Sequence, residues 1–127
     1  MNRVTLNKKI RSLNITLENQ VNTLTLDQSP NIYLHINSYG GSVFAGFSAV
    51  DYIKNSKTPI YSTIDGCAAS AATMMSIVAD ERYMHEHAFM LIHQLSAGSW
   101  GKHEELKDDM MNNELLMETI KSIYTEH

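Results

Sequence analysis

The stretch Asn31-Ile-Tyr-Leu-His-Ile-Asn-Ser-Tyr-Gly-Gly-Ser-Val43 decides the fold class of this chain. Its first half is rich in β-branched and aromatic residues, which favour a strand, and its second half is rich in turn residues. Apolar residues then recur at helical spacing up to Asn55, and Pro59 precedes a second strand over residues 60–64. The order strand, loop, helix, strand predicts two parallel strands joined by a right-handed crossover, and therefore an α/β fold.

The rest of the chain extends this pattern in both directions. The run from Cys67 to Val78 is too apolar for a surface helix and predicts a buried one. Short strands are expected around residues 82–84 and 89–92, and a long helix is expected after Gly101. Towards the N-terminus, we expect a short strand at residues 3–6 and a helix over residues 15–29, with Asn14 as its cap.

Composition limits the classes of function. The 127 residues are 43% hydrophobic and 19% charged, which is typical of one globular domain with a modest core. A net charge of -4 gives no positive surface for nucleic acid or an anionic membrane, and no apolar run is long enough to span a bilayer. The single cysteine, Cys67, cannot form an internal disulfide and fits a reducing compartment, so a cytoplasmic protein is expected.

Three features place reactive groups at the carboxyl ends of strands, where α/β proteins bind ligands. Gly40 and Gly41 can present backbone N–H groups to an anion or oxyanion, although a plain turn with Ser42 as helix cap also explains them. Ser70 lies among alanines at the expected start of a helix, which suits a nucleophile, a cap or a packing residue. His93 ends an expected strand, which suits a general base or a hydrogen-bonded rim residue.

The histidines His85 and His87 are one residue apart and would share a face of an extended segment. They would need Cys67 and His103 to complete a zinc site, and no ligand spacing supports that arrangement. We interpret them as surface residues, and we predict no metal site and no cofactor.

Three blocks, in this order, resemble those that identify the ClpP peptidase family: Ile36-Asn-Ser-Tyr-Gly-Gly-Ser-Val43, Gly66-Cys-Ala-Ala-Ser-Ala71 and Met90-Leu-Ile-His-Gln94. The resemblance extends from about Arg3 to the end of the chain. It implies a ClpP/crotonase-like spiral of ββα units with a handle strand and a long handle helix. Residues 1–127 would form one domain, with its head over about residues 1–92 and its handle over about residues 93–127.

The resemblance also implies roles for individual residues. Ser70 falls on the nucleophile and His93 on its general base, while the backbone N–H groups of Gly41 and Ala71 fall on the oxyanion hole. The segments that would pair with a substrate strand contain Ser42, Val43, Leu95 and Ser96. The acid of the triad follows the handle helix in the family, and no residue of this chain takes that position; Asp108 and Asp109 are expected to serve the helix dipole instead. The chain is accordingly expected to be truncated at both ends.

The activity implied by the resemblance is that of a serine endopeptidase, which hydrolyses peptide bonds in unfolded proteins or peptides through an acyl-enzyme. The implied partners are further copies of the chain in stacked heptameric rings and an AAA+ ATPase unfoldase. Two alternatives stay open. One is a catalytically silent ClpP-like ring subunit or truncated core, and the other is a crotonase-type acyl-CoA enzyme, whose superfamily resembles ClpP in its spiral core and backbone oxyanion hole.

Overall fold

A computed structural model of the chain describes residues 8–14 and 30–127. The strand expected at residues 3–6 and the helix expected over residues 15–29 lie outside the described residues. Asn14, expected to cap that helix, is instead the last of the helical residues 8–14 among those described. Its Oδ1 accepts a hydrogen bond from the Ser56 hydroxyl at 3.0 Å, and Ile10 of the same segment is buried. This segment is therefore part of the folded core.

The chain divides into two compact units, residues 1–91 and residues 92–127. The sequence placed the division between head and handle after residue 92. Ser70, Gly41 and Ala71 belong to the first unit, whereas His93 belongs to the second.

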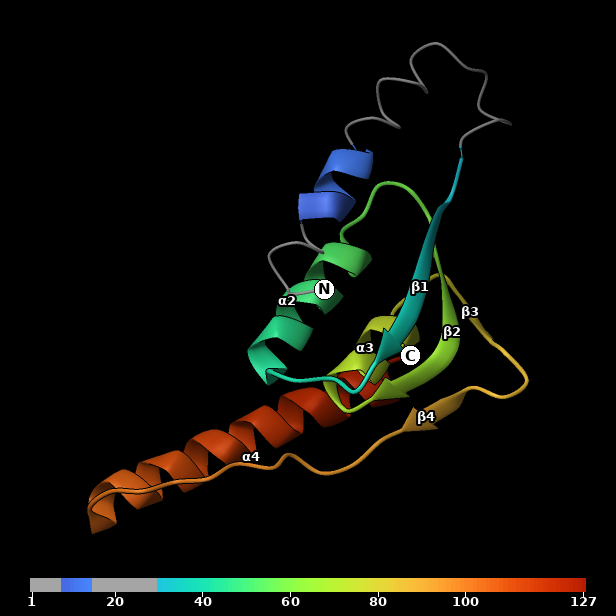
Figure 1. Cartoon of the computed structure of the whole chain (residues 1–127). Helices are drawn as coiled ribbons and strands as arrows, with labels where there is room; N and C mark the ends of the chain where they lie inside the picture. The colour runs from blue at the N-terminus through green and yellow to red at the C-terminus, as the bar shows by residue number, and fades with distance from the viewer. Residues whose placement is uncertain (1–7, 15–29) are drawn as a thin grey trace. The chain divides into compact units, whose positions relative to one another are not determined.

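A parallel sheet forms the centre of the first unit. In the described part of the chain its strands are β1 (Ile32–Ser38), β2 (Ile60–Ala69), β3 (Glu81–Met84) and β4 (Phe89–Leu91). β1 and β3 pair with β2 from its two sides, and β4 pairs with a later part of β2. Helix α2 (Val43–Lys54) connects β1 to β2, and α3 (Ala71–Ile77) connects β2 to β3 (Figure 1). The predicted α/β fold is confirmed.

The pairing of β1 with β2 contains a bulge just before β2 ends. Ile36 is opposite Ile64, but Ser38 is opposite Ala68, so two steps along β1 correspond to four steps along β2. The Asn37 side chain stabilises the bulge, because its Oδ1 accepts a hydrogen bond from the Cys67 N–H at 3.2 Å. After the bulge, β2 continues for two residues beyond Cys67 and pairs with β4.

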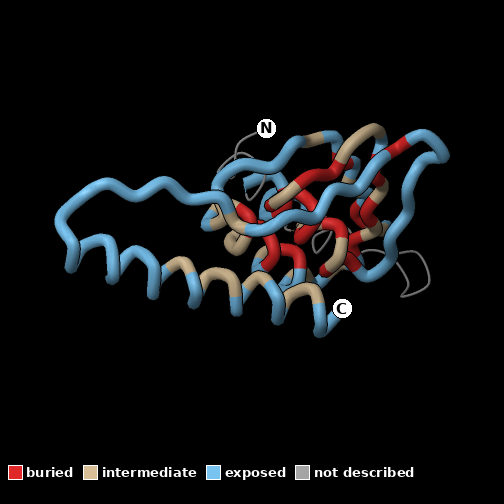
Figure 2. The backbone as a smooth tube through the Cα atoms, turned by 90° about the horizontal axis from the view of Figure 1, so that it is seen from below, coloured by how far each residue is buried: buried red, intermediate tan, exposed pale blue. Residues whose placement is uncertain are grey.

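One side of the sheet and the two helices enclose the core, which appears as the red segments of the first unit in Figure 2. Ile36 and Ile64 pack there with alanines of β2 and α3. The helices approach each other closely at Gly46 of α2, where an added Cβ would lie 2.5 Å from the Met74 Cε and 3.2 Å from the Ala71 Cβ. Glycine at this position therefore allows α2 to pack closely against the first residues of α3.

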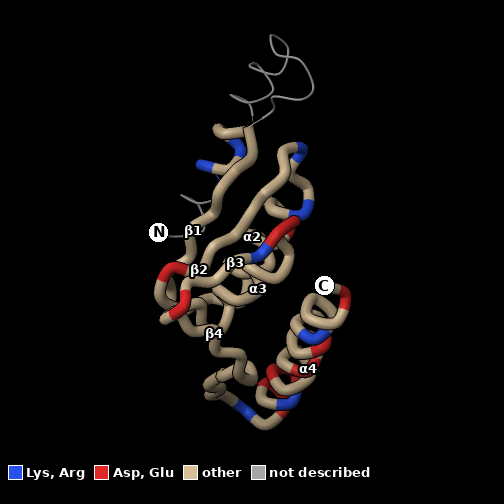
Figure 3. Tube along the Cα trace, turned by 90° about the vertical axis from the view of Figure 1, so that its right-hand side faces the viewer, with Lys and Arg blue, Asp and Glu red and all other residues tan. Residues whose placement is uncertain are grey.

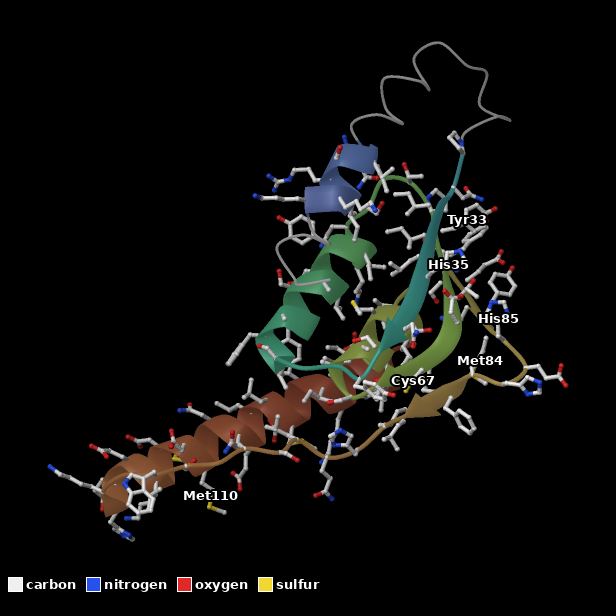
Figure 4. All side chains as sticks on the ribbon, in the orientation of Figure 1. Tyr33, His35, Cys67, Met84, His85 and Met110 are labelled. Atoms are coloured by element: carbon white, nitrogen blue, oxygen red, sulfur yellow. The ribbon has the colours of Figure 1, made fainter. Side chains whose placement is uncertain are left out.

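The other side of the sheet is exposed and carries aromatic and ionisable side chains. Tyr33 and His35 point to this side from β1, and His85 approaches them from the end of β3 (Figure 4). Both histidines contact the same carboxylate oxygen of Asp65: His35 Nδ1 is 2.9 Å and His85 Nε2 is 3.3 Å from Oδ1. The hydrogen bond with His35 is the largest influence that lowers the pKa of Asp65 below its ordinary value.

The second unit consists of an irregular segment followed by helix α4 (His103–Thr125), which confirms the long helix predicted after Gly101. The Glu105 side chain caps the start of this helix, because its Oε2 accepts a hydrogen bond from the Lys102 N–H at 2.8 Å. Acidic and basic residues alternate with uncharged ones along α4 (Figure 3), and Met110 and Met111 are exposed on this helix. Within the described ranges, no helix combines the length and the apolar character needed to cross a bilayer.

Candidate active site

Ser70 lies at a sharp corner between β2 and α3. Its backbone has φ 54° and ψ -129°, and among the described residues it is the only one other than glycine with a positive φ. Such a conformation costs about 1–3 kcal/mol and persists only when surrounding structure enforces it. Strained corners between a strand and a helix are used to expose nucleophilic serines. The expected position of Ser70 at the start of a helix is confirmed, since α3 begins at Ala71. The assignment of the run from Cys67 to Ala69 to the same helix is wrong, because β2 continues to Ala69.

Hydrogen bonds on both sides of Ser70 enforce this conformation. On the N-terminal side, the Ser70 N–H donates to the carbonyl oxygen of Leu91 at 2.9 Å, which continues the pairing of Ala69 with Leu91. On the C-terminal side, the Ser70 carbonyl accepts from the Thr73 N–H at 3.0 Å and from the Thr73 hydroxyl at 2.6 Å. The backbone at Ser70 is therefore set by β4 and by the first turn of α3.

The Ser70 side chain does not cap α3. Ser70 occupies the N-cap position, but its hydroxyl makes no capping hydrogen bond to the helix, and the residue is only half-buried. In contrast, Ser42 does cap α2, since its Oγ accepts from the Ala45 N–H at 3.4 Å. The Ser70 side chain is therefore not a helix cap. The prediction that Ser42 caps the helix after it is confirmed.

The two glycines of the loop between β1 and α2 lie beside this corner. At Gly40, with φ +91°, an added Cβ would lie 2.5 Å from the Ala69 carbonyl oxygen, 2.8 Å from the Ser70 Cβ and 3.0 Å from the Ala71 nitrogen. Gly41 has φ +139°, and an added Cβ there would meet nothing within 4 Å. The loop thus contacts Ser70 and Ala71 through Gly40, and Gly41 borders open space. Both backbones are in a region that side chains disfavour.

The remaining residues expected to bind substrate lie at the start of α2 and in the second unit. Ser42 is extended, with φ -59° and ψ 126°, whereas Val43 is the first residue of α2. Leu95 and Ser96 lie in the irregular segment before α4, where the Leu95 N–H points at the Met117 sulfur at 3.3 Å. Only Ser42 of the first pair therefore keeps a backbone that suits pairing with a strand.

His93 is exposed, and its Nδ1 lies 2.7 Å from the Gln94 carbonyl oxygen. A carbonyl can only accept, so the proton of the neutral imidazole belongs on Nδ1 in this arrangement, and Nε2 keeps its lone pair. Nε2 is then the atom that can take a proton. Asp108 and Asp109 lie within α4 and are exposed, and neither is assigned as a triad acid.

The histidines and the cysteine that we considered as metal ligands lie in the described part of the chain. Among residues 8–14 and 30–127, no three His, Cys, Asp or Glu side chains are grouped so that they could hold a metal ion. His85, which we interpreted as a surface residue, is exposed, and its contact with Asp65 was not foreseen. The free thiol of Cys67 is half-buried beside the bulge of β2.

Sequence reasoning missed three contributors to the corner at Ser70. The close contact of Gly40 and the carbonyl of Leu91 depend on pairing between segments far apart in the chain, which leaves no local signal. Thr73 did have a signal, because a threonine three residues after an N-cap position can bond back to that residue's carbonyl.

Comparison with known proteins agrees with this geometry. Residues 3–127 match the family described as Clp protease. The ATP-dependent Clp protease proteolytic subunit of Streptococcus mutans is 36% identical over 99 residues, which are 76% of this chain and 50% of that protein. The proteolytic subunit 1 of Chlamydia muridarum is 40% identical over 77 residues, or 59% of this chain and 40% of that protein. The chain spans about half the length of these curated relatives. Because the family match covers nearly every residue, the chain belongs to the Clp protease family.

Proposed function

We propose that this protein is the proteolytic subunit of a Clp-type protease, a serine endopeptidase in which Ser70 is the nucleophile. The observation that carries the proposal is the strained backbone of Ser70, whose hydroxyl is left out of helix capping. A serine held at such a cost, with its side chain free for chemistry, fits a nucleophile better than a structural residue. Membership of the family favours a peptidase over the crotonase-type alternative.

In the proposed reaction, the Ser70 oxygen attacks the carbonyl carbon of a peptide and forms a tetrahedral intermediate with a negatively charged oxygen. The backbone N–H groups of Gly41 and Ala71 donate hydrogen bonds to this oxyanion. The contact of Gly40 with the Ala71 nitrogen supports the pairing, because it brings the glycine loop and the start of α3 to the same place. One donor of this kind contributes about 3 kcal/mol to the transition state.

His93 is the proposed general base. Its Nε2 takes the proton of Ser70 and then passes it to the leaving amine, after which water hydrolyses the acyl-enzyme by the same steps. The hydrogen bond to the Gln94 carbonyl supports this role because it favours the required tautomer. A triad acid would also stabilise the imidazolium, and loss of that charge costs about 10⁴ in rate in the serine-protease template. The proposal assigns no triad acid.

The substrates and partners are also proposals. We infer that unfolded polypeptide binds as an added strand between the segments of Ser42–Val43 and Leu95–Ser96, with backbone pairing giving broad tolerance of sequence. The relatives' names, ATP-dependent protease and subunit, support a homo-oligomeric assembly fed by an AAA+ ATPase. The resemblance supports stacked heptameric rings and a cytoplasmic location, and it gives no cofactor.

Labelling with a fluorophosphonate tests the nucleophile. This probe phosphonylates an activated serine, so we expect labelling of the intact assembled protein at Ser70, located by mass spectrometry of its peptides. Ser70→Ala should abolish the label, and His93→Ala should slow it strongly. Ser122→Ala is the matched control: it removes an exposed hydroxyl of α4 and should label at the normal rate.

Labelling and a measurement of acyl-CoA binding together separate the alternatives. A folded, assembled protein that takes no label at Ser70 would be the silent ring subunit, and the proposed activity would be wrong. Binding of acyl-CoA thioesters that survives Ser70→Ala would instead indicate the crotonase-type chemistry.

A further inference from the structure

Hydrogen bonds fix the carbonyl end of the peptide unit between Ser70 and Ala71. Its carbonyl oxygen belongs to Ser70 and accepts two hydrogen bonds from Thr73, one from the backbone N–H at 3.0 Å and one from the hydroxyl at 2.6 Å. Thr73 has no exposed surface, so its hydroxyl makes this hydrogen bond from a position that water does not reach. Both donors come from the first turn of α3.

The other end of the same peptide unit is the N–H of Ala71. A peptide bond is planar and trans, so its C=O and N–H point in opposite directions. Fixing the Ser70 carbonyl towards Thr73 therefore fixes the direction of the Ala71 N–H on the opposite side. The Ala71 nitrogen is also the atom that would lie 3.0 Å from a Cβ at Gly40, so it lies against the glycine loop.

Threonine side chains often bond back to a carbonyl three or four residues earlier in a helix, and such a bond alone has no functional meaning. This chain offers a direct comparison, because the Thr125 hydroxyl donates to the Ser122 carbonyl at 3.2 Å in α4. At Ser122 the backbone is helical and exposed, whereas at Ser70 it is strained. A strained peptide has an alternative, relaxed orientation available to it. The hydrogen bond from the Thr73 hydroxyl therefore opposes rotation of the Ser70–Ala71 peptide plane. The hydrogen bond from Thr125 has no such effect, because the backbone at Ser122 is already relaxed.

We propose that Thr73 is a positioning residue whose hydroxyl locks the Ser70–Ala71 peptide plane and so keeps the Ala71 N–H directed at the oxyanion. The proposal rests on the proposed function of Ser70. Thr73 does not touch substrate; it acts through Ala71. A peptide plane that rotates would remove one oxyanion donor for part of the time and leave the binding of substrate nearly unchanged.

The variants that test this are Thr73→Val, which keeps the shape and loses the hydroxyl, and Thr73→Ser, which keeps the hydroxyl. Ser76→Ala is the matched control, because it removes another buried hydroxyl of α3, one that lies 3.2 Å from the Ser62 hydroxyl. With a fluorogenic peptide, we expect Thr73→Val to lower kcat about tenfold or more, short of the 100- to 1000-fold that a lost donor costs, with KM within about twofold. Thr73→Ser should restore kcat. Ser76→Ala should lower the melting temperature and leave kcat unchanged.

A second measurement does not depend on activity. In NMR spectra of the isotopically labelled protein, Thr73→Val should shift and split or broaden the Ser70 carbonyl and Ala71 amide resonances, whereas Ser76→Ala should leave the Ala71 amide unchanged. Unchanged Ala71 resonances in Thr73→Val, or an equal loss of kcat in Ser76→Ala, would overturn the positioning role. If the parent protein is inactive while Thr73→Val still perturbs Ala71, the proposed peptidase activity fails and the lock on the peptide plane stands.

Discussion

Replacing Gly40 by alanine tests the contact between the glycine loop and the corner at Ser70. The new methyl group would lie 2.5 Å from the Ala69 carbonyl oxygen and 3.0 Å from the Ala71 nitrogen, both of them backbone atoms that cannot rotate away. Overpacking of this kind costs about 1–3 kcal/mol. The positive φ adds about 1–2 kcal/mol for a residue with a Cβ. Alanine also lowers the conformational entropy of the unfolded chain, and this offsets about 0.4–1 kcal/mol of the loss in stability.

The expected net loss in the free energy of unfolding for Gly40→Ala is therefore about 1–4.6 kcal/mol, on the terms just given. Two other glycines separate these terms. Gly41→Ala has the positive φ without the contact, so its loss should be about 0–1.6 kcal/mol. Gly98 has neither a positive φ nor a neighbour within 4 Å, so Gly98→Ala should be neutral or slightly stabilising.

Urea unfolding followed by circular dichroism measures all three variants. The midpoint falls by the loss in stability divided by a slope of about 1–3 kcal/mol/M, so Gly40→Ala should lower it the most. A Gly40→Ala chain that fails to fold, beside a folded Gly41→Ala chain, would agree with the same ranking. Equal midpoints for Gly40→Ala and Gly41→Ala would refute the reasoning, because they would show that the close approach of Gly40 to Ala69 and Ala71 contributes nothing.

Two further predictions concern charge and capping. The lowered pKa of Asp65 means that its ionised form stabilises the fold above the ordinary carboxyl range, and that this contribution is lost as the pH falls through the lowered value. In an NMR titration, His35→Ala should raise the pKa of Asp65 more than His85→Ala does; the reverse order would contradict the ranking of the two contacts. Ser42→Ala should cost about 1 kcal/mol in urea unfolding through loss of the α2 cap, and Ser42→Asp should keep most of it, so equal losses would argue against capping.

Local sequence patterns predicted most of the fold because hydrophobic periodicity and turn residues are local signals. The strand before Asn37, the helix after Ser42 and the helix after Gly101 all occur where the patterns place them. The exception is the run from Cys67 to Ala69, which we assigned to a helix. Small apolar residues suit either structure, and here the decision is made by pairing with residues 89–91, which no local pattern reveals.

The candidate site shows the same limit. Glycines, a serine among alanines and a histidine after an expected strand were recognisable as residue types, and their order supplied the family resemblance. The strand was expected to reach residue 92, whereas β4 ends at Leu91, so His93 follows it after one further residue. The positive φ of Ser70 was not predictable, because serine has no preference for it and the surrounding hydrogen bonds impose it. Likewise, the contact of His35 and His85 with Asp65 follows from sheet register, which joins residues 30 and 20 positions away from Asp65.

The bulge in β2 has a consequence for how this sequence can vary over evolutionary time or in protein engineering. Between Ile64 and Ala68, β2 takes two more residues than β1, an even number, so side chains before and after the bulge keep the same alternation of faces. Adding or deleting a single residue at Asp65, Gly66 or Cys67 would turn Ala68 outwards and rotate the Ser70 corner to the wrong face of the sheet. The number of residues in this short stretch is therefore constrained. Insertion of a single residue, which a surface loop would tolerate, should disrupt the fold here, whereas insertion of two residues keeps the alternation of faces.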